Sequence, residues 1–465
     1  MQPPLSVESL ASSGIRQIAI TWVNHAGASL VKVVPLRQLQ HAIDAGVGFS
    51  PVSDAFRTDG VIDPTHRCAR PDGDLRLRAD PASIAILDPV HGWAWAAGDR
   101  WERDRTAYKA DQRQFCRRMG ESLEDAGLSM TAGFELEWFL LTPVGNGSPQ
   151  PVIPGGPYGA DRLIEGMDYA TALLHALDQA DVPWIQFHPE YGPSQFELSF
   201  SPDHPLKAAD LLIRARLVVQ RVTRTFGWMA SFSPKPRLDS VGNGGHVHFS
   251  VRDEEGPLLE NGQGPAGLRP RGEALIAGLL HRLPSLVALA SPSPVSFLRL
   301  VPSTWSAPFQ VWGIENREAA LRLIPSAQDH CPAHLEVKAV DPTTNPYLLL
   351  GALQALVIDA VANPLPLPDP CVGDPATCVN SSDLQRLPDT LAEARQAFEA
   401  DDVLLNAMGL VLHGSLLDSM TAEIKRVEDF TAQQQVDDLC WWPVVGGYWP
   451  RSDHSAVGVT GSLNK

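Results

Sequence analysis

The chain has 465 residues, 44% of them hydrophobic, which is enough for a large buried core and suggests two or more domains. Its 37 basic and 54 acidic residues give a net charge of −17 at pH 7, which argues against binding to nucleic acid or to anionic membranes. Such a charge fits a soluble enzyme whose ligands arrive with divalent cations, and simple solubility explains it equally well.

The cysteines and the N-terminus predict a cytoplasmic protein. None of the six cysteines lies in a Cys-x-x-Cys pair, so we expect free thiols in a reducing compartment. The first residues lack the basic start and apolar run of a signal peptide. The apolar stretch 347–362 contains Asp359 and is too short for a membrane span, so it predicts a buried helix. The cysteines are Cys68, Cys116, Cys331, Cys371, Cys378 and Cys440.

The first hundred residues predict a small domain. Two β-rich runs within residues 15–35 flank His25-Ala26-Gly27, a pattern typical of a hairpin. A helical pattern at 36–46 ends on Gly46, and short strands follow to about Trp95. The pattern predicts a domain of mixed helices and strands over residues 1–107.

A helical period over residues 106–129 marks the start of a second domain, residues 108–465. Strands with unusual polar residues follow. A Pro-rich loop at 363–378 precedes a helix-rich tail from about Ser382. The predicted fold class is α+β.

The stretch TAGFELEWFLL, residues 131–141, predicts a buried strand that carries Glu135 and Glu137. Residues two apart in a strand point to the same face, so both carboxylates are aimed at one place. Like charges repel, and unpaired buried charges are costly. Something must neutralise the pair.

Four further segments place polar residues in strand-like or loop sequence. In HVH and LEVK, as in FELEW, the polar residues share one face, which predicts a curved sheet with a polar concave face. Carboxylates and imidazoles there suit Mg²⁺ or Mn²⁺, arginines suit phosphate, and together they indicate phosphoryl transfer. The residues are Glu190 and Glu197, His246 and His248, Arg317 and Arg322, and Glu336 and Lys338.

Each segment alone has a simpler interpretation. The Glu135–Glu137 pair could be the exposed side of a strand, the two histidines satisfied polar groups, and NREAALR a solvated helix face. The GNGG loop lacks both the Walker pattern and the GxGxxG spacing. The joint occurrence of these segments favours a site.

In these stretches the chain resembles prokaryotic-type glutamine synthetases over nearly its whole length. The resemblance rests on GFELEWFLL, HPEYGPSQFE, SFSPKPRLDSVGNGGHVHFS, RLVPSTWSAP, NREAALR and HLEVKAVDPTTNPYLLLGALQAL, in the family's order. It implies an N-terminal β-grasp domain and a catalytic domain with a curved antiparallel sheet flanked by helices. It also implies a double-ring homo-oligomer, commonly a dodecamer, with active sites between subunits.

The resemblance also implies the chemistry and the residues that carry it. ATP would phosphorylate the γ-carboxylate of glutamate, and an amine would then displace the phosphate. Two or more Mg²⁺ or Mn²⁺ ions would be held, one by Glu137, Glu190 and Glu197 and another by Glu135, His246 and Glu336. His248, Ser250 and His334 would contact ATP, Arg317 and Arg322 would stabilise the phosphoryl group with Glu336 in the catalytic set, and Gly242, Arg299 and Lys338 would bind glutamate.

Two acids of the family's ammonium pocket are missing. An FDGSS-like segment reads FSPVS here and places Ser50 at the acid's position, with Asp54 nearby but out of register. A VPGYEAP-like segment reads VPSTWSAP, with Trp305 and no acid. Because a carboxylate pair attracts and deprotonates ammonium, whereas an aromatic face suits a larger amine, we expect an organic amine acceptor and a γ-glutamylamide product.

Alternatives remain open at this point. The chain could be a glutamine synthetase that finds its acid elsewhere, or a non-catalytic scaffold or regulator, although all six metal-ligand positions are filled. His334 and Lys338 stand where the family has arginines, so the donor could be a glutamate analogue. No tyrosine lies between Tyr347 and Tyr448, so we expect no regulation by adenylylation.

Overall fold

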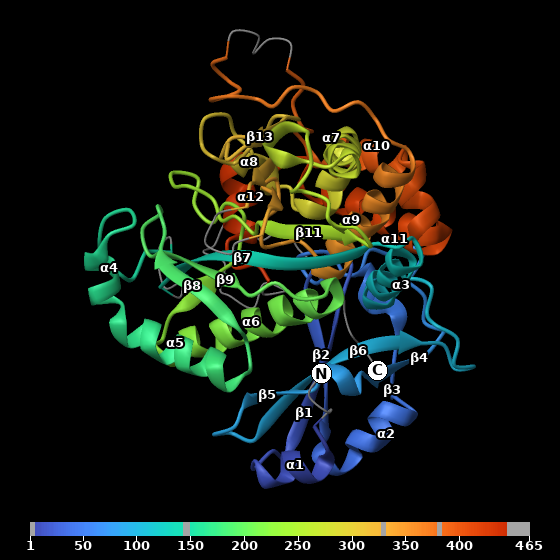
Figure 1. Cartoon of the computed structure of the whole chain (residues 1–465). Helices are drawn as coiled ribbons and strands as arrows, with labels where there is room; N and C mark the ends of the chain where they lie inside the picture. Colours follow the sequence, from blue (N-terminus) through green and yellow to red (C-terminus); the bar gives the residue numbers. More distant parts are fainter. Residues whose placement is uncertain (1–4, 143–148, 327–331, 379–383, 444–465) are drawn as a thin grey trace.

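Two sheets organise the chain, one in each of its two structural parts (Figure 1). The computed structural model describes residues 5–142, 149–326, 332–378 and 384–443. In Figure 1 the N-terminal elements form the lower, blue part, and the remaining strands and helices form the larger part above it. This arrangement confirms the α+β class.

The N-terminal sheet has the described strand order β2-β1-β6-β4-β3, with β5 paired to β6. Strands β1 and β2 form the predicted antiparallel hairpin, whereas β1 and β6 are parallel. The predicted helix ends near Gly46, whose φ of 78° is the left-handed conformation that favours glycine. The elements are α1 (Val7–Ser12), β1 (Gln17–Val23), β2 (Ser29–Pro35), η1 (Leu36–Gln38), α2 (Leu39–Asp44), β3 (Val47–Phe49), η2 (Pro51–Ala55), β4 (Leu75–Ala79), η3 (Pro81–Ser83), β5 (Ala85–Asp88) and β6 (Trp93–Trp101).

The larger sheet has the described order β13-β14-β15-β11-β7-β9-β8, with β10 beside β7 and β12 beside β11. Its pairs are antiparallel as predicted, except that β13 and β14 are parallel. The long strand β7 pairs with β11 along its first half and with β9 along its second half. The strands are β7 (Ser129–Leu141), β8 (Trp184–Pro189), β9 (Gln195–Phe200), β10 (Met229–Ser231), β11 (Val247–Asp253), β12 (Gly256–Pro257), β13 (Trp312–Ile314), β14 (Leu321–Ile324) and β15 (His334–Val337).

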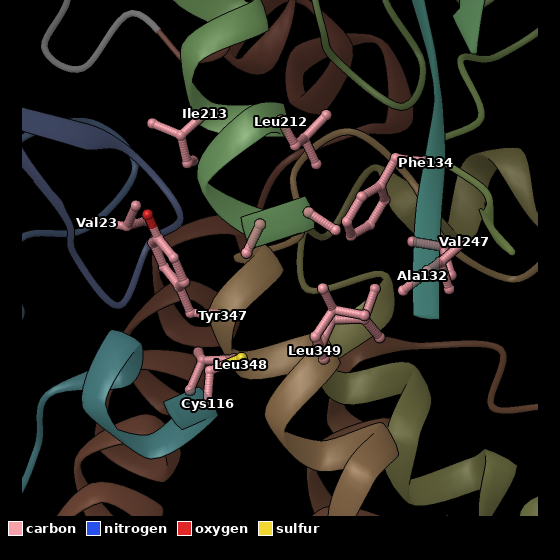
Figure 2. Close-up of a cluster of buried hydrophobic side chains, with 14 of the residues drawn as sticks. Val23, Cys116, Ala132, Phe134, Leu212, Ile213, Val247, Tyr347, Leu348 and Leu349 are labelled. Carbon is pink, nitrogen blue, oxygen red and sulfur yellow. The ribbon is translucent and has the colours of Figure 1, made fainter. Parts of the chain in front are cut away.

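Helices cover the apolar face of this sheet. Figure 2 shows Ala132 and Phe134 of β7 pointing toward Leu212 of α6 and Leu349 of α9, so the glutamates between the apolar residues of β7 face the other side. The stretch predicted as a buried helix is α9, whose first turn is capped by the Asn345 side chain. The helices are α3 (Gln112–Asp125), α4 (Ala160–Glu165), α5 (Met167–Gln179), α6 (Pro205–Thr225), η4 (Pro265–Gly267), α7 (Pro270–Ala290), α8 (Ser296–Arg299), α9 (Pro346–Ala362), α10 (Leu391–Glu399), α11 (Asp402–Val427) and α12 (Ala432–Leu439).

Two of the described helices, α7 and α11, are long and apolar enough to cross a membrane by length and composition alone. The most apolar window of α7 is 78% buried, which makes it a core helix, and that of α11 is 39% buried. Gly409, at φ 75° and ψ 162°, interrupts the helical geometry of α11.

Buried ion pairs join the two parts of the chain. Arg100 of β6 contacts Asp54 at 2.8 Å and Asp111, the N-cap of α3, at 3.2 Å. Arg113 of α3 contacts Asp99 of β6 at 2.7 Å. Because a buried charge is tolerated only when paired, these contacts fix how the parts meet. The domain boundary between residues 107 and 108 stays a prediction.

The five cysteines within the described residues are free, as predicted. Cys331 lies outside the described residues.

Helices α7 and α9 lie so close together at Gly278 that a larger residue there should reduce stability. A Cβ on Gly278 of α7 would lie 2.4 Å from the Cβ of Ala360 on α9, whereas a Cβ on Gly156 would meet nothing within 4 Å. We expect Gly278→Ala to destabilise the protein by about 1–3 kcal/mol, because the two helices must separate, and Gly156→Ala to have little effect. Urea unfolding of both variants tests this, and equal stabilities would contradict it.

Candidate active site

The polar face of the larger sheet gathers the predicted carboxylates. Glu135 and Glu137 lie on β7, and the antiparallel register places Glu197 of β9 directly opposite Glu137. Glu190 follows β8, in the turn that leads to β9. The period-2 prediction for FELEW is therefore confirmed by the strand pairing.

His188 belongs to the same cluster, although the sequence interpretation missed it. Its Nε2 lies 3.1 Å from Glu190 Oε1 and 4.0 Å from Glu197 Oε1. Ligand atoms of these three residues lie within 4.8 Å of one another, a spacing that could hold a metal ion. The sequence contains a signal for this: His188 lies in a strand, two residues before Glu190, the spacing that places two side chains on one face. Tyr158 stacks on the His188 ring, with centroids 6.4 Å apart.

A second cluster joins three strands. His248 Nε2 of β11 lies 3.2 Å from Glu135 Oε1, and His248 pairs in register with Glu336 of β15. Ligand atoms of these three residues also lie within 4.8 Å of one another. This grouping differs from the one the resemblance implies, in which His246 accompanies Glu135 and Glu336.

His246 lies between the two clusters. Its Nε2 is 3.7 Å from Glu137 Oε1, and its Nδ1 is 3.9 Å from Glu336 Oε1 and 3.1 Å from the carbonyl oxygen of Lys338. A carbonyl can only accept a hydrogen bond, so Nδ1 carries the proton and leaves the lone pair of Nε2 free to bind a cation. Its role as a metal ligand stays a prediction.

The protonation of the cluster reflects its excess of negative charge. Burial, reinforced by Glu190, raises the pKa of Glu137 to about 7. Burial and the neighbouring carboxylates raise the pKa of Glu197 well above its ordinary value. Two divalent cations would remove the repulsion between these groups, so the donor set fits the predicted Mg²⁺ or Mn²⁺.

Glu336 is the exception, because cations surround it. Lys338 Nζ lies 3.1 Å from one carboxylate oxygen and Arg322 Nη1 lies 3.0 Å from the other. Burial alone would raise the pKa of Glu336, but Lys338 and its other cationic neighbours lower it. Arg322 is therefore positioned beside the second cluster. Arg317 lies in the exposed loop between β13 and β14.

The residues predicted to bind glutamate lie beside Glu137. A Cβ on Gly242 would come within 2.3 Å of the Pro234 carbonyl oxygen and 2.8 Å of Arg299 Cγ, so only glycine fits there. Arg299 is buried, and its Nη1 has no hydrogen-bond partner among the residues that the structure describes, which leaves a donor for a substrate carboxylate. Gln195, which the sequence interpretation missed, donates to Glu137 at 2.8 Å and to the Gly242 carbonyl at 2.9 Å.

The residues predicted to bind ATP lie further along β11 and β15. The rings of His248 and His334 are 5.3 Å apart, and His334 Nδ1 lies 3.0 Å from the Pro332 carbonyl oxygen. Ser250 Oγ lies 2.9 Å from Thr131 Oγ1 of β7. These contacts place His334 and Ser250 beside the second cluster, to which His248 belongs.

The predicted amine-pocket residues come from different parts of the chain. Ser50 caps η2, where its Oγ accepts a hydrogen bond from the Val52 amide at 3.3 Å, and Trp305 lies in the loop 301–307 with 57% of its surface exposed. Asp54 cannot replace the missing acid, because it is fully buried between Arg100 and His25. Burial alone would raise the pKa of Asp54, but Arg100 and His25 hold it at about 2.

Glu318 supplies a carboxylate to the Trp305 loop. It is 6% exposed, and its Oε1 accepts a hydrogen bond from the Trp305 amide at 2.5 Å, whereas its Oε2 is buried and has no partner within the described part of the chain. Ser303, Trp305 and Ala307 all have left-handed φ values near 58°, a strained backbone for residues other than glycine. The sequence interpretation passed over this acid because it lies inside NREAALR, not in the VPSTWSAP segment.

A family model described as glutamine synthetase, catalytic domain, matches residues 109–439. The chain belongs to the glutamine synthetase family. Ligases of this family use ATP and divalent metal ions, act on small molecules and are typically oligomeric. Membership confirms the predicted family and the predicted ligase class.

The similar proteins include one named for γ-glutamylpolyamine synthesis and one named for glutamine synthesis. The chain is 38% identical to "Gamma-glutamylpolyamine synthetase GlnA3" of Streptomyces coelicolor, over 90% of this chain and 92% of that protein. It is 28% identical to "Glutamine synthetase" of Pyrococcus horikoshii, over 85% and 86% of the two chains.

Solved structures confirm the fold. "Crystal structure of novel glutamine synthase homolog" matches with a TM-score of 0.82 at 28% identity, over 92% of this chain and 98% of that one. "GmaS/ADP complex-Conformation 1" matches with a TM-score of 0.81 at 24% identity, over 93% and 97%, and supports the fold alone.

The charge of Glu137 gives a pH-dependent prediction. Its raised pKa means that the metal-free protein loses stability as pH rises from about 4.5 to about 7. Over this range the unfolded chain has released the proton, whereas the folded state still holds it, so rising pH favours the unfolded chain. We expect metal-free Glu137→Gln to exceed the wild type by about 2 kcal/mol at pH 8 and to match it below pH 4.5. Urea unfolding in EDTA at both pH values tests this, with the exposed Glu121→Gln as control. Equal stabilities of the wild type and Glu137→Gln at pH 8 would show that the charge of Glu137 does not destabilise the folded protein.

Proposed function

We propose that this protein joins the γ-carboxyl group of glutamate to a cationic organic amine, with a polyamine as the leading acceptor, at the expense of ATP. The observation that carries the proposal is the altered amine pocket, in which Ser50 and Trp305 stand where the family has acids. The relative named for γ-glutamylpolyamine synthesis supports it. We further propose cytoplasmic location and a double-ring dodecamer with sites between subunits, built from domains 1–107 and 108–465.

The reaction has two steps. The γ-carboxylate of glutamate attacks the γ-phosphorus of ATP and breaks its bond to ADP, which gives γ-glutamyl phosphate. The amine, having lost the proton of its ammonium form, then attacks the acyl carbon, expels phosphate and loses a second proton as the amide forms. Arg317 and Arg322 would donate to the phosphoryl oxygens, which suits their fixed charge and forked donors.

The remaining residues bind and orient the substrates. Arg299 and Lys338 would hold the carboxylates of glutamate, with Lys338 kept in place by its contact with Glu336. Bound Mg²⁺ or Mn²⁺ ions, at the six ligand positions, would neutralise the carboxylate cluster and the phosphates of ATP. His188 is an additional candidate ligand.

Glu318 adds an acid to the proposed amine pocket. Its unpartnered Oε2 would accept a hydrogen bond from the ammonium group of the acceptor, while the exposed Trp305 ring offers a face to the rest of the molecule. Because Oε2 is buried and Oε1 is bound to the Trp305 amide, we propose that the acceptor displaces the loop 301–307, whose strained residues would ease such a movement. One carboxylate would also attract ammonium, which keeps glutamine synthesis as the alternative.

The first test is phosphate release with ATP, Mg²⁺ and glutamate across a panel of acceptors. The panel contains ammonium, methylamine, ethanolamine, putrescine, spermidine and an aromatic amine. We expect one organic amine to give a turnover rate at least tenfold above that of ammonium. Ammonium as the best acceptor would favour glutamine synthesis, and no turnover with any amine would favour a non-catalytic role.

Glu318→Gln tests the acid in the pocket. The amide keeps an acceptor for the Trp305 N–H but loses the negative charge, so we expect KM for the preferred cationic amine to rise about tenfold or more, with little change in KM for ATP or glutamate. Hydroxylamine is largely uncharged at neutral pH, so its turnover should be unaffected.

The exposed Glu315→Gln, in the same loop, provides the matched control. Equal losses with hydroxylamine and with the cationic amine would assign Glu318 a purely structural role.

A further inference from the structure

One cavity of the protein lies away from the carboxylate clusters. It has a volume of about 230 Å³ and lies between the β1–β2 turn, α6, β10 and the segment Trp442–Pro443. Helix α6 covers the apolar face of the sheet (Figures 1 and 2). Glu135 and Glu137 face the other side, because side chains alternate along a strand. The polar residues that line the cavity are Ser29, Arg216, Gln220 and Arg224.

Arg216 is a buried cation without a matching anion. It is 4% exposed, and among the described residues it forms no ion pair. Its two terminal nitrogens are 3.4 Å from the Thr344 carbonyl oxygen, at the outer limit of a hydrogen bond, and its Nε has no partner. The Trp442 ring lies 5.6 Å away and offers a cation–π contact but no negative charge.

Two other buried arginines, Arg100 and Arg113, show what Arg216 lacks. Arg162 also has no ion pair among the described residues, but it donates to three backbone carbonyls at 2.5, 2.6 and 2.8 Å. Arg100 and Arg113 are buried as deeply, and each contacts two or more carboxylates at 3.2 Å or less. Burial lowers the pKa of Arg216 to about 9, opposed only by Asp341, which does not contact it. The cost of burying this charge is therefore not offset by a partner within the described residues.

The other polar side chains of the cavity complete a site for an anion. Arg224 is exposed on α6 and adds a second positive charge, Gln220 offers an amide donor and Ser29 a hydroxyl. Among the described residues, no acidic residue lines the cavity. Its volume suits a small ion and is below that of most sites for drug-sized ligands.

We propose that this cavity binds a small dianion, a phosphate or a short dicarboxylate, between Arg216 and Arg224. The two forked guanidinium groups would each donate hydrogen bonds to its oxygens. The site joins the N-terminal hairpin to α6, and Gly27 at the turn would place a Cβ 2.5 Å from the Thr343 carbonyl oxygen, so the hairpin packs directly on the loop that Arg216 contacts. An anion bound there therefore stabilises the junction of the two parts of the chain.

The test measures binding of inorganic phosphate and of succinate to the full chain, by isothermal titration calorimetry and thermal unfolding, with Mg²⁺–ADP present to occupy the nucleotide site. We expect at least one of the two anions to raise the unfolding temperature saturably, and the two arms identify which chemistry the site takes. Arg216→Met should weaken binding at least tenfold. It should unfold no earlier than the wild type in anion-free buffer, because it removes an unpaired buried charge.

Two further variants keep the test decisive. Arg224→Gln changes an exposed residue and should weaken anion binding several-fold without affecting folding. If Arg216→Met does not fold, this variant still tests whether the anion binds in the cavity. Arg221→Gln removes the same charge from the same helix outside the cavity and should bind like the wild type. Unchanged binding in Arg216→Met and Arg224→Gln, or no saturable response to either anion, would overturn the proposal.

Discussion

Repulsion among carboxylates on one face of the larger sheet is the constraint on which the site depends. Glu137 faces Glu197 across the β7–β9 pair, and burial keeps both harder to ionise than ordinary carboxylates. The opposite face of β7 must remain apolar because α6 and α9 pack on it. The sheet thus separates an apolar core from a polar face whose charges require cations, and the chemistry of the family follows from that requirement.

The sequence allowed the sheet and most of its polar face to be predicted, because strand periodicity is a strong local signal. The pairs in FELEW, HVH and LEVK each placed their side chains on one face before any strand partner was known. The sequence could not predict that His248, and not His246, joins Glu135 and Glu336, since this depends on where β11 begins and on how each ring turns. Gln195 was missed because only the pairing of β7 and β9 brings it to Glu137. His188 was missed although its spacing from Glu190 is local.

The amine pocket was the least predictable part, because its residues lie on loops. Asp54 is close to Ser50 in sequence, yet the 3₁₀ turn η2 directs it inward to Arg100. Glu318 lies thirteen residues after Trp305, and its contact with that residue depends on left-handed backbone conformations that are common only for glycine, asparagine and aspartate. A motif comparison finds the missing acids but cannot find an acid that reaches the same loop from elsewhere.

The long central strand also has a consequence for the unfolded chain. Thr131 of β7 meets Ser250 of β11 across 119 residues of sequence, and Glu135 pairs with Ser199 of β9 across 64 residues, so β7 stays unpaired until these later strands form. An unpaired strand as apolar as FELEWFLL is an aggregation hazard during synthesis. Glu135 and Glu137 place two negative charges within it, and such charges oppose edge-to-edge association. The same glutamates whose repulsion destabilises the metal-free sheet therefore oppose aggregation of the strand before the sheet forms.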